Sequence, residues 1–405
     1  MARPSQQIFV TLFLAFVVGV FVSPRMPAST VALNYYTHSI HVNGTERQVR
    51  VPEGYRLELV TTELRGPRMI SIGPAGELLI GSKSGLIYRL AQPYREVEVL
   101  ARVGGYPHSL LVRDDELFVA RTDGVYAIGY TSGNPLDMVR ARTVATLPSG
   151  PGHNTRTIAL GPDGRIFVSL GISSNCSEQF LGEPYAFDQR RGGVLVLNET
   201  VEPPVWETFA SGLRNPVGFD WHPGTGVMYA SNNGPDHLGY ENPREYFSKL
   251  APGSFHGMPW FQYDGERLRR DGCASGEPPL PIGQVAVPVA TFPARNAPMA
   301  VGFIPIGAMD PSLEGDAVVA LRGSWGTLPS GSASGDPATR REPKLVVVRF
   351  ESGVAARVDD LVTGFQLENG KRWARPVGAK VGPDGALYFT SDEGVNSVFR
   401  LVRLK

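Results

Sequence analysis

The sequence predicts an all-β fold, a six-bladed β-propeller with four-stranded antiparallel blades, and three observations support this. Glycine and proline are abundant, with 47 Gly and 34 Pro in 405 residues, and both are spread along the chain. A unit that consists of a tight turn and a short apolar strand recurs six times. No stretch has a helical period of hydrophobic residues. Frequent turns of this kind favour many short strands over long helices.

Each repeated unit opens on a turn rich in Gly, Pro or Asp and continues into β-branched or aromatic residues. The first unit is GPAGELLIGSKSGLIYRL, and the units begin at Gly73, Arg113, Gly161, His222, Glu314 and Gly382. Several continue into a second apolar run, which indicates a hairpin. A blade needs roughly 40 to 50 residues, so six units fit the chain with a surplus for loops. A β-sandwich or two barrels share these strand and turn signals, but six like units favour the propeller.

Two segments complete the predicted ring. The widest gap between units contains a Pro/Gly-rich stretch, and a long inserted loop is expected around residues 250–295. The last unit ends close to the C-terminus, where an N-terminal strand usually completes the final blade. Tyr55–Thr61 (YRLELVT) is therefore expected to pair with the C-terminal unit and close the ring.

The N-terminus carries an apolar run, Ile8–Val22, after the basic residue Arg3. Its length fits the core of a signal peptide and is short for a membrane span, although a retained anchor is the alternative. Residues 1–30 are accordingly interpreted as a signal peptide or N-terminal membrane anchor, and residues 31–405 as a single propeller domain. Both interpretations place that domain outside the cytoplasm, in the periplasm or the extracellular space.

Charge and cysteine content limit the possible partners. The chain has 39 basic and 39 acidic residues, so nothing in its net charge indicates binding to nucleic acid. The only two cysteines are Cys176 and Cys273. In an oxidising compartment they could form a disulfide, but two separate thiols are equally compatible with the sequence.

Propellers bind ligands at the mouth of the central channel, so polar residues beside the apolar strands are the candidates for a site. His153 precedes the strand of the third unit and could serve as a general base, because the ordinary pKa of imidazole lies near neutral pH. Arg214, in the motif SGLRNPVG, offers a planar fork of donors to a carboxylate or a quinone oxygen. Taken alone, a loop histidine and a buried or surface arginine are more often structural.

Two further clusters follow along the chain. The motif NNGPD, residues 232–236, forms a turn whose backbone carbonyls could bind a hard cation such as Ca²⁺. Arg322, Arg372 and Arg375 lie beside aromatic residues and could bind a planar polyanion. The ordinary interpretations are a plain turn and a solvated run of charge.

The order of these motifs carries more information than any one of them. GHNTRTIALGPDGRIFVSLG, ASGLRNPVGFDWHP, NNGPD, LRGSWG and RPVGAKVGPDGALYFTSDEG follow one another, and together they resemble the soluble quinoprotein glucose/sorbosone dehydrogenases. The resemblance extends over roughly Val51 to Leu401. It implies a six-bladed propeller that holds pyrroloquinoline quinone (PQQ) and Ca²⁺. It further implies oxidation of an aldose or sorbosone-type sugar, with an external electron acceptor.

The resemblance also implies roles for individual residues. His153 would remove the proton of a sugar hydroxyl, and Arg214 would contact the quinone oxygens beside it. Other implied cofactor-binding residues are Asn215, Arg322, Arg372 and Arg375. The implied metal-binding residues are Gly234 and Pro235, through their carbonyls, and Glu245 at a separate structural calcium.

The chain departs from the glucose-oxidising branch of that family in two places. Arg322 stands where that branch has a lysine, which leaves the affinity for PQQ open. The spacing from His153 to Arg156 is one residue shorter, and Tyr106 and His108 lie near the expected sugar site.

Two other functions stay open on the sequence. One is a Ca²⁺-dependent lactonase-like hydrolase, which would need several acidic or Asn ligands that converge on the axis; the available acids are Asp163, Asp384 and Asp392. The other is a non-catalytic propeller that binds sugar or protein.

Overall fold

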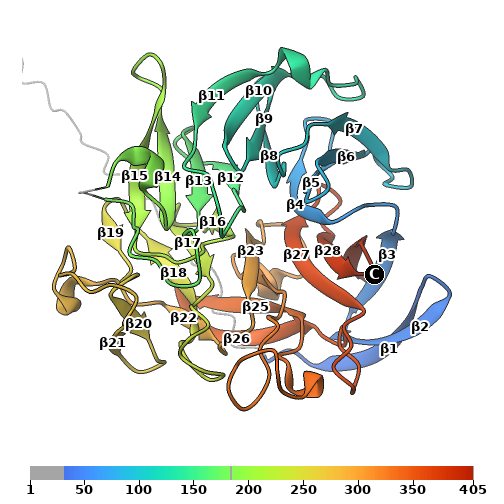
Figure 1. The fold of residues 1–405 in the computed structure, drawn as a ribbon. Helices are drawn as coiled ribbons and strands as arrows, with labels where there is room; N and C mark the ends of the chain where they lie inside the picture. The colour runs from blue at the N-terminus through green and yellow to red at the C-terminus, as the bar shows by residue number, and fades with distance from the viewer. Residues whose placement is uncertain (1–31, 183–184, 405) are drawn as a thin grey trace, which may run out of the picture.

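The fold is a ring of six antiparallel blades around a central channel (Figure 1). It is seen in a computed structural model that describes residues 32–182 and 185–404. These residues form strands and short 3₁₀ turns, without an α-helix in the described ranges. The predicted fold class is thus confirmed. The N-terminal segment expected to be a signal peptide or anchor lies outside the described residues, and in the rest no helix is long and apolar enough to cross a membrane.

The first three blades follow one another in the chain, each from the channel outward. Blade 1 consists of β4 (Pro67–Ile72), β5 (Leu78–Ser82), β6 (Leu86–Leu90) and β7 (Glu98–Arg102). Blade 2 consists of β8 (Ser109–Arg113), β9 (Glu116–Arg121), β10 (Gly124–Gly129) and β11 (Arg142–Thr146). Blade 3 consists of β12 (Ile158–Leu160), β13 (Ile166–Leu170), β14 (Gly193–Asn198) and β15 (Val205–Ser211), with β19 (Ser254–Phe255) added in parallel at its edge.

The other three blades complete the ring. Blade 4 consists of β16 (Phe219–Trp221), β17 (Met228–Asn232), β18 (Glu245–Leu250) and β22 (Ala290–Phe292). Blade 5 consists of β23 (Pro298–Phe303), β24 (Ala317–Leu321), β25 (Lys344–Glu351) and β26 (Val354–Val362). Blade 6 consists of β27 (Ala374–Val381), β28 (Leu387–Gly394), β29 (Ser397–Arg403) and β3 (Tyr55–Thr61).

Short elements lie outside the blades. A hairpin of β1 (Tyr35–Val42) and β2 (Thr45–Pro52) precedes the ring, and β20 (Phe261–Tyr263) pairs with β21 (Leu268–Arg270). The 3₁₀ turns are η1 (Met138–Arg140), η2 (Phe187–Gln189), η3 (Ile282–Gln284), η4 (Pro311–Leu313) and η5 (Pro337–Thr339).

The ring closes as the sequence predicts. β3 pairs antiparallel with β29, with Leu57 opposite Leu401, and Figure 1 shows the blue N-terminal strand beside the red C-terminal ones. The segment at 250–295 is more ordered than the expected loop, because it contains the β20–β21 hairpin and supplies β22 to blade 4.

The repeated turns explain why each unit forms a hairpin. In three of them the amide of the fourth residue donates to the carbonyl of the first: Gly76 to Gly73, Gly164 to Gly161 and Gly385 to Gly382. The donor glycines have φ near +78°, a value that residues with a side chain rarely adopt. The turn therefore reverses the chain at the same point in each of these blades.

The described residues form eight core clusters, and six of them lie between two neighbouring blades. The other two lie where the loop after β13 meets the insertion of blade 4. The second strand of a blade is therefore covered on both faces. This explains why strands such as β5 (LLIGS), β13 (IFVSL) and β24 (AVVAL) are buried along their full length instead of alternating. The stacked blades make the inner strands a rigid support for side chains at the channel mouth.

Candidate functional site

A polar cavity of 260 Å³ lies at one mouth of the channel, where the inner strands begin. Residues from every blade except blade 2 reach it directly or through the preceding loop. The predicted residues that line it are His153, Arg214, Asn215, Gly234, Glu245, Arg322 and Arg375. The sequence motifs therefore converge in space, because each one lies at the same end of its blade.

His153 is held in one tautomer at this cavity. Its Nδ1 lies 2.7 Å from the carbonyl oxygen of Ile172, which can only accept, so Nδ1 carries the proton and donates it. This leaves Nε2 as an acceptor. Burial, and next the positive charge of Arg214, lower the pKa of His153 to about 4, so the ring is neutral at pH 7. A neutral imidazole with a free Nε2 lone pair is the form that a general base requires.

Arg214 is buried beside the histidine and is held by backbone and side-chain acceptors. Its Nε donates to the carbonyl of Asn175 at 2.8 Å, and its Nη2 donates to Asn175 Oδ1 at 2.9 Å. Burial lowers the pKa of Arg214, against an opposing effect of Asp236, whose Oδ2 lies 3.9 Å from Nη2. Asn215 follows Arg214 in the chain, and its backbone N–H donates to Asn232 Oδ1 at 2.9 Å.

A network of ion pairs supports the opposite side of the cavity. The buried carboxylate of Asp392 lies 2.6 Å from Arg68 Nη1, 2.9 Å from Lys83 Nζ and 2.8 Å from Arg322 Nε. Its three cationic neighbours hold the pKa of Asp392 well below its usual range, although burial alone would raise it. Glu393 extends the network, with its Oε2 2.6 Å from Arg375 Nη1.

Arg68 is a functional candidate that the sequence motifs did not include. It is the second residue of β4, the inner strand of blade 1, and lines the cavity, with a side chain 5% exposed. Its Nε is buried and has no hydrogen-bond partner in the structure. A buried guanidinium with an unsatisfied donor is costly, and a bound anion would satisfy it. Arg68 stands apart from every repeated unit, so no local pattern marked it.

The predicted basic set divides into two groups. Arg322 and Arg375 line the cavity, and burial lowers the pKa of Arg375 to about 10. Arg372 does not line it: its guanidinium donates to Gln366 Oε1 at 3.0 Å and to the carbonyl of Arg341 at 2.8 Å. Arg372 thus holds loops together beneath the rim, and this geometry does not favour the expected contact with a cofactor.

The predicted metal turn is only partly accessible. Gly234 lines the cavity, and no described residue donates to its carbonyl. The carbonyl of Pro235 instead accepts from Arg295 Nη1 at 2.9 Å, and Pro235 is absent from the cavity wall. A guanidinium at that distance opposes a divalent cation on the same oxygen. The turn therefore fits Ca²⁺ through Gly234 alone.

Glu245 is fully buried behind that turn. Its Oε2 accepts from the amide of Gly234 at 2.7 Å, and its Oε1 accepts from the amide of Arg295 at 3.0 Å. Burial raises the pKa of Glu245 to about 7. Its oxygens are thus occupied by backbone donors, a geometry that supports the turn and does not favour the expected structural calcium.

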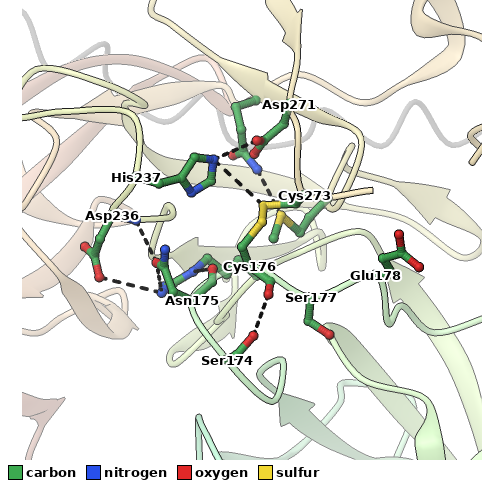
Figure 2. The surroundings of a disulfide bond; sticks show 12 residues. Ser174, Asn175, Cys176, Ser177, Glu178, Asp236, His237, Asp271 and Cys273 are labelled. Carbon is green, nitrogen blue, oxygen red and sulfur yellow. Dashed lines mark hydrogen bonds and ion pairs between the residues drawn. A yellow bond between two sulfur atoms is a disulfide. The ribbon is translucent and has the colours of Figure 1, made fainter. Parts of the chain in front are cut away.

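The two cysteines form a disulfide, with Cα atoms 5.2 Å apart (Figure 2). Within the described ranges, the only group of His, Cys, Asp or Glu close enough to share a metal ion is Cys176, Cys273 and His237. Two of its members are joined to each other, so they are not free ligands. Asp163 and Asp384 instead cap their own turns by accepting the amides of Arg165 and Ala386. A lactonase-like cluster of carboxylates is therefore not assembled by the described residues.

The residues expected near the sugar lie behind Arg68. His108 is fully buried, which holds its pKa well below the usual value, and its Nε2 lies 3.4 Å from Arg68 Nη2. The ring of Tyr106 packs edge-on against His108. Trp325, which the motif LRGSWG contains, lines the cavity and is 47% exposed. It is the large aromatic surface at the rim.

Comparison with solved structures supports the fold. A Trichoderma reesei carbohydrate-active enzyme of family AA12 superposes with a TM-score of 0.72 at 19% identity, over 92% of this chain and 99% of that one. The PQQ domain of pyranose dehydrogenase from Coprinopsis cinerea gives 0.69 at 20% identity, over 88% and 97%. The soluble aldose sugar dehydrogenase of Escherichia coli gives 0.62 at 15% identity, over 86% and 99%. At these identities the likeness establishes the propeller fold.

Comparison with sequences defines the family. An uncharacterised protein of Borreliella burgdorferi is 23% identical over 372 residues, which is 87% of this chain and 90% of that protein. The sequence model of the TrAA12-like family matches residues 49–254, just over half of the chain. That match spans blades 1 to 3, β3 and part of blade 4, and it includes His153, Arg214 and the Gly234–Pro235 turn. The chain therefore belongs to the TrAA12-like family.

Proposed function

We propose that this protein is a PQQ-dependent oxidoreductase that oxidises an aldose or a sorbosone-type sugar and passes the electrons to an external acceptor. One observation carries the proposal: a histidine whose Nε2 is left as an acceptor lines the same cavity as four arginines. One of these, Arg68, has a buried Nε without a hydrogen-bond partner among the described residues. The proteins with similar structures include a PQQ domain and a sugar dehydrogenase, which is consistent with this assignment.

The cavity suits a planar polyanion. Arg68, Arg214, Arg322 and Arg375 line it, and their positive charges favour an anion. Each of them already donates to protein acceptors, which orient the guanidinium groups around the cavity. Arg322, which stands in place of a lysine, is already oriented by Asp392 and Glu393. We therefore assign PQQ binding to these four arginines together with Asn215. Arg372 contributes indirectly, through the carbonyls of Gly323 and Arg341.

When it is bound, PQQ supplies a quinone that accepts a hydride. His153 Nε2 takes the proton from the sugar hydroxyl, while the Nδ1–H···O=C bond to Ile172 keeps the ring oriented. A positive charge at Arg214 favours negative charge that develops on a neighbouring oxygen. Trp325 offers an aromatic face on which a sugar ring can pack. Gly234 would provide one carbonyl ligand to Ca²⁺, and the remaining ligands would have to come from the cofactor and water.

The proposed location is the periplasm or the extracellular space. The disulfide supports it, because such bonds persist in oxidising compartments and are rare in the cytosol.

The decisive experiment measures PQQ binding to the purified protein by absorbance and melting shift, with and without Ca²⁺, and then dye reduction with a panel of aldoses and sorbosone. We expect binding, and turnover that His153→Gln abolishes, whereas the exposed control His41→Gln leaves it intact. Absence of PQQ binding by the folded protein would contradict the proposal and would favour a non-catalytic binding role.

A further inference from the structure

The loop after β13 supports the guanidinium of Arg214 through Asn175, which Figure 2 shows beside Cys176 and Asp236. Asn175 accepts from Arg214 Nε through its carbonyl and from Arg214 Nη2 through Oδ1, at 2.8 Å and 2.9 Å. The same Oδ1 also accepts from the amide of Asp236 at 2.7 Å. Asn175 therefore connects the arginine of the cavity with the Gly-Pro-Asp turn.

The neighbouring residue fixes this loop to the insertion of blade 4. Cys176 is joined to Cys273, 97 residues later, and Cys273 lies within the segment 250–295. The other polar link nearby is exposed: the amide and hydroxyl of Ser275 donate to Glu178 Oε1. Further along the loop, Phe180 packs on Trp260 with ring centroids 5.0 Å apart. The disulfide is the covalent restraint at the point where the loop touches Arg214.

We propose that Asn175 is a positioning residue for Arg214, and that the Cys176–Cys273 disulfide keeps it in place, so that anion binding in the cavity depends on the redox state of the two cysteines. Arg214 has little freedom while Asn175 accepts from both Nε and Nη2, the two donors on one edge of its guanidinium. When the disulfide opens, the loop gains conformational entropy. It then samples conformations in which the two hydrogen bonds from Arg214 to Asn175 are broken. The inference rests on the proposed function for the identity of the anion, PQQ.

The surroundings of the disulfide are suited to thiol exchange. Cys176 is half-buried and Cys273 is buried, so an external thiolate reaches the Cys176 sulfur more easily. That attack breaks the S–S bond, forms a mixed disulfide with Cys176 and releases Cys273 as a thiolate. His237 Nε2 lies 3.9 Å from Cys273 Sγ and 2.8 Å from Asp271 Oδ1, and the released thiolate takes its proton from solvent. The second thiol of a dithiol reductant then displaces Cys176 and leaves oxidised as a disulfide.

The test compares PQQ affinity in the oxidised and the dithiothreitol-reduced full chain, with free thiols counted in each sample. Reduction should weaken binding by about 10-fold or more, the loss expected when hydrogen bonds to a charged group are given up. Cys176→Ser/Cys273→Ser should bind weakly with or without reductant. Asn175→Ala should bind PQQ weakly although its disulfide is intact. Asn175→Asp should bind PQQ as the wild type does, because it keeps the side-chain acceptor. Asn198→Ala on the outer surface is the matched control.

A second readout does not require the cofactor. Hydrogen exchange at the amide of Asp236, which donates to Asn175 Oδ1, should become faster on reduction and in Asn175→Ala, while melting temperatures show that all samples are folded. Unchanged exchange and unchanged affinity after complete reduction would overturn the redox dependence, and an Asn175→Ala variant identical to wild type in both would overturn the positioning role. If the oxidised wild type binds no PQQ but the exchange responds as expected, the proposed function fails and the positioning of the loop stands.

Discussion

Arg68 and Asp392 are 324 residues apart in the chain, yet Arg68 Nη1 lies 2.6 Å from Asp392 Oδ2. The pair joins β4, the inner strand of the first blade, to β28, the second strand of the last blade, at the edge of the cavity. Lys83 and Arg322 contact the same carboxylate, so one anion orients three cations. One carboxylate therefore links the first blade to the last and also orients two arginines that line the cavity.

Asp392→Asn should destabilise the fold, because it leaves buried guanidinium groups without their counter-charge. A loss of about 3–5 kcal/mol in the free energy of unfolding is expected for a broken buried pair. Urea denaturation at pH 7 measures it. Glu199→Gln removes an exposed partner of Arg113 and should change stability by less than about 1 kcal/mol. Equal effects of the two substitutions would show that the Asp392 network adds nothing beyond a surface pair.

Arg68→Lys should weaken PQQ binding by roughly 10-fold, because lysine keeps the charge near Asp392 but loses the planar fork and the unsatisfied Nε. Arg372→Lys should have a smaller effect, since Arg372 does not line the cavity. Titration of each variant with PQQ, followed by absorbance, compares the two. A larger loss for Arg372→Lys would reverse the assignment of these residues.

The pH dependence of turnover should report the protonation of His153. Without ligand its pKa is about 4, lowered by burial and by Arg214, and the imidazole must be neutral to accept a proton. Activity should therefore fall as pH decreases through this pKa. A bound anion offsets the charge of Arg214 and raises the pKa, so the midpoint for turnover should lie above 4. NMR titration of the ring in the free and the bound protein checks the direction, and a midpoint that moves downward on binding would contradict it.

Stability should decrease as pH falls from about 6.5 towards 4. His153 and His256 have pKa values of about 4 in the folded protein and an ordinary value of 6.5, so the unfolded state takes up more protons in this interval. His108, whose pKa is also lowered by burial, acts in the same direction. Glu245 opposes them, because its raised pKa of about 7 makes the folded state bind more protons between 4.5 and 7.

Burial also lowers the pKa of His222, and it raises the pKa of Asp316 to about 6. Four histidines therefore oppose two carboxyl groups in this interval, so the histidines set the sign of the net slope. Urea denaturation at several pH values measures it, and His256→Gln should reduce the slope whereas the exposed His41→Gln should not. Stability that is constant or rises on acidification would show that these histidines are not held neutral.

Calcium should not bind the protein tightly in the absence of the cofactor. Arg295 occupies the carbonyl of Pro235 and pairs with Asp236, so Gly234 is left as the one predicted carbonyl ligand for an ion that takes six to eight oxygens. Calorimetric titration of the cofactor-free protein should give a dissociation constant weaker than about 1 mM, the weak end of extracellular calcium sites. Tight binding without PQQ would mean that the turn rearranges.

Local patterns in the sequence were sufficient to predict the strands, the number of blades and the closing strand Tyr55–Thr61. Each of these depends on turn residues and on apolar runs that are contiguous in the chain. The motifs around His153, Arg214 and Arg375 also indicated the right end of the ring, because each one precedes or begins an inner strand.

Only the tertiary structure decided which side chains face the cavity. In the folded protein Arg68 lines the cavity and pairs with Asp392, whereas Arg372 does not line it. The carbonyl of Pro235 accepts from Arg295, and Cys176 is bonded to Cys273. Each of these contacts joins residues from different blades or loops, at separations that range from tens to hundreds of positions. Their geometry follows from how the blades stack, and no local pattern of polar residues contains that information.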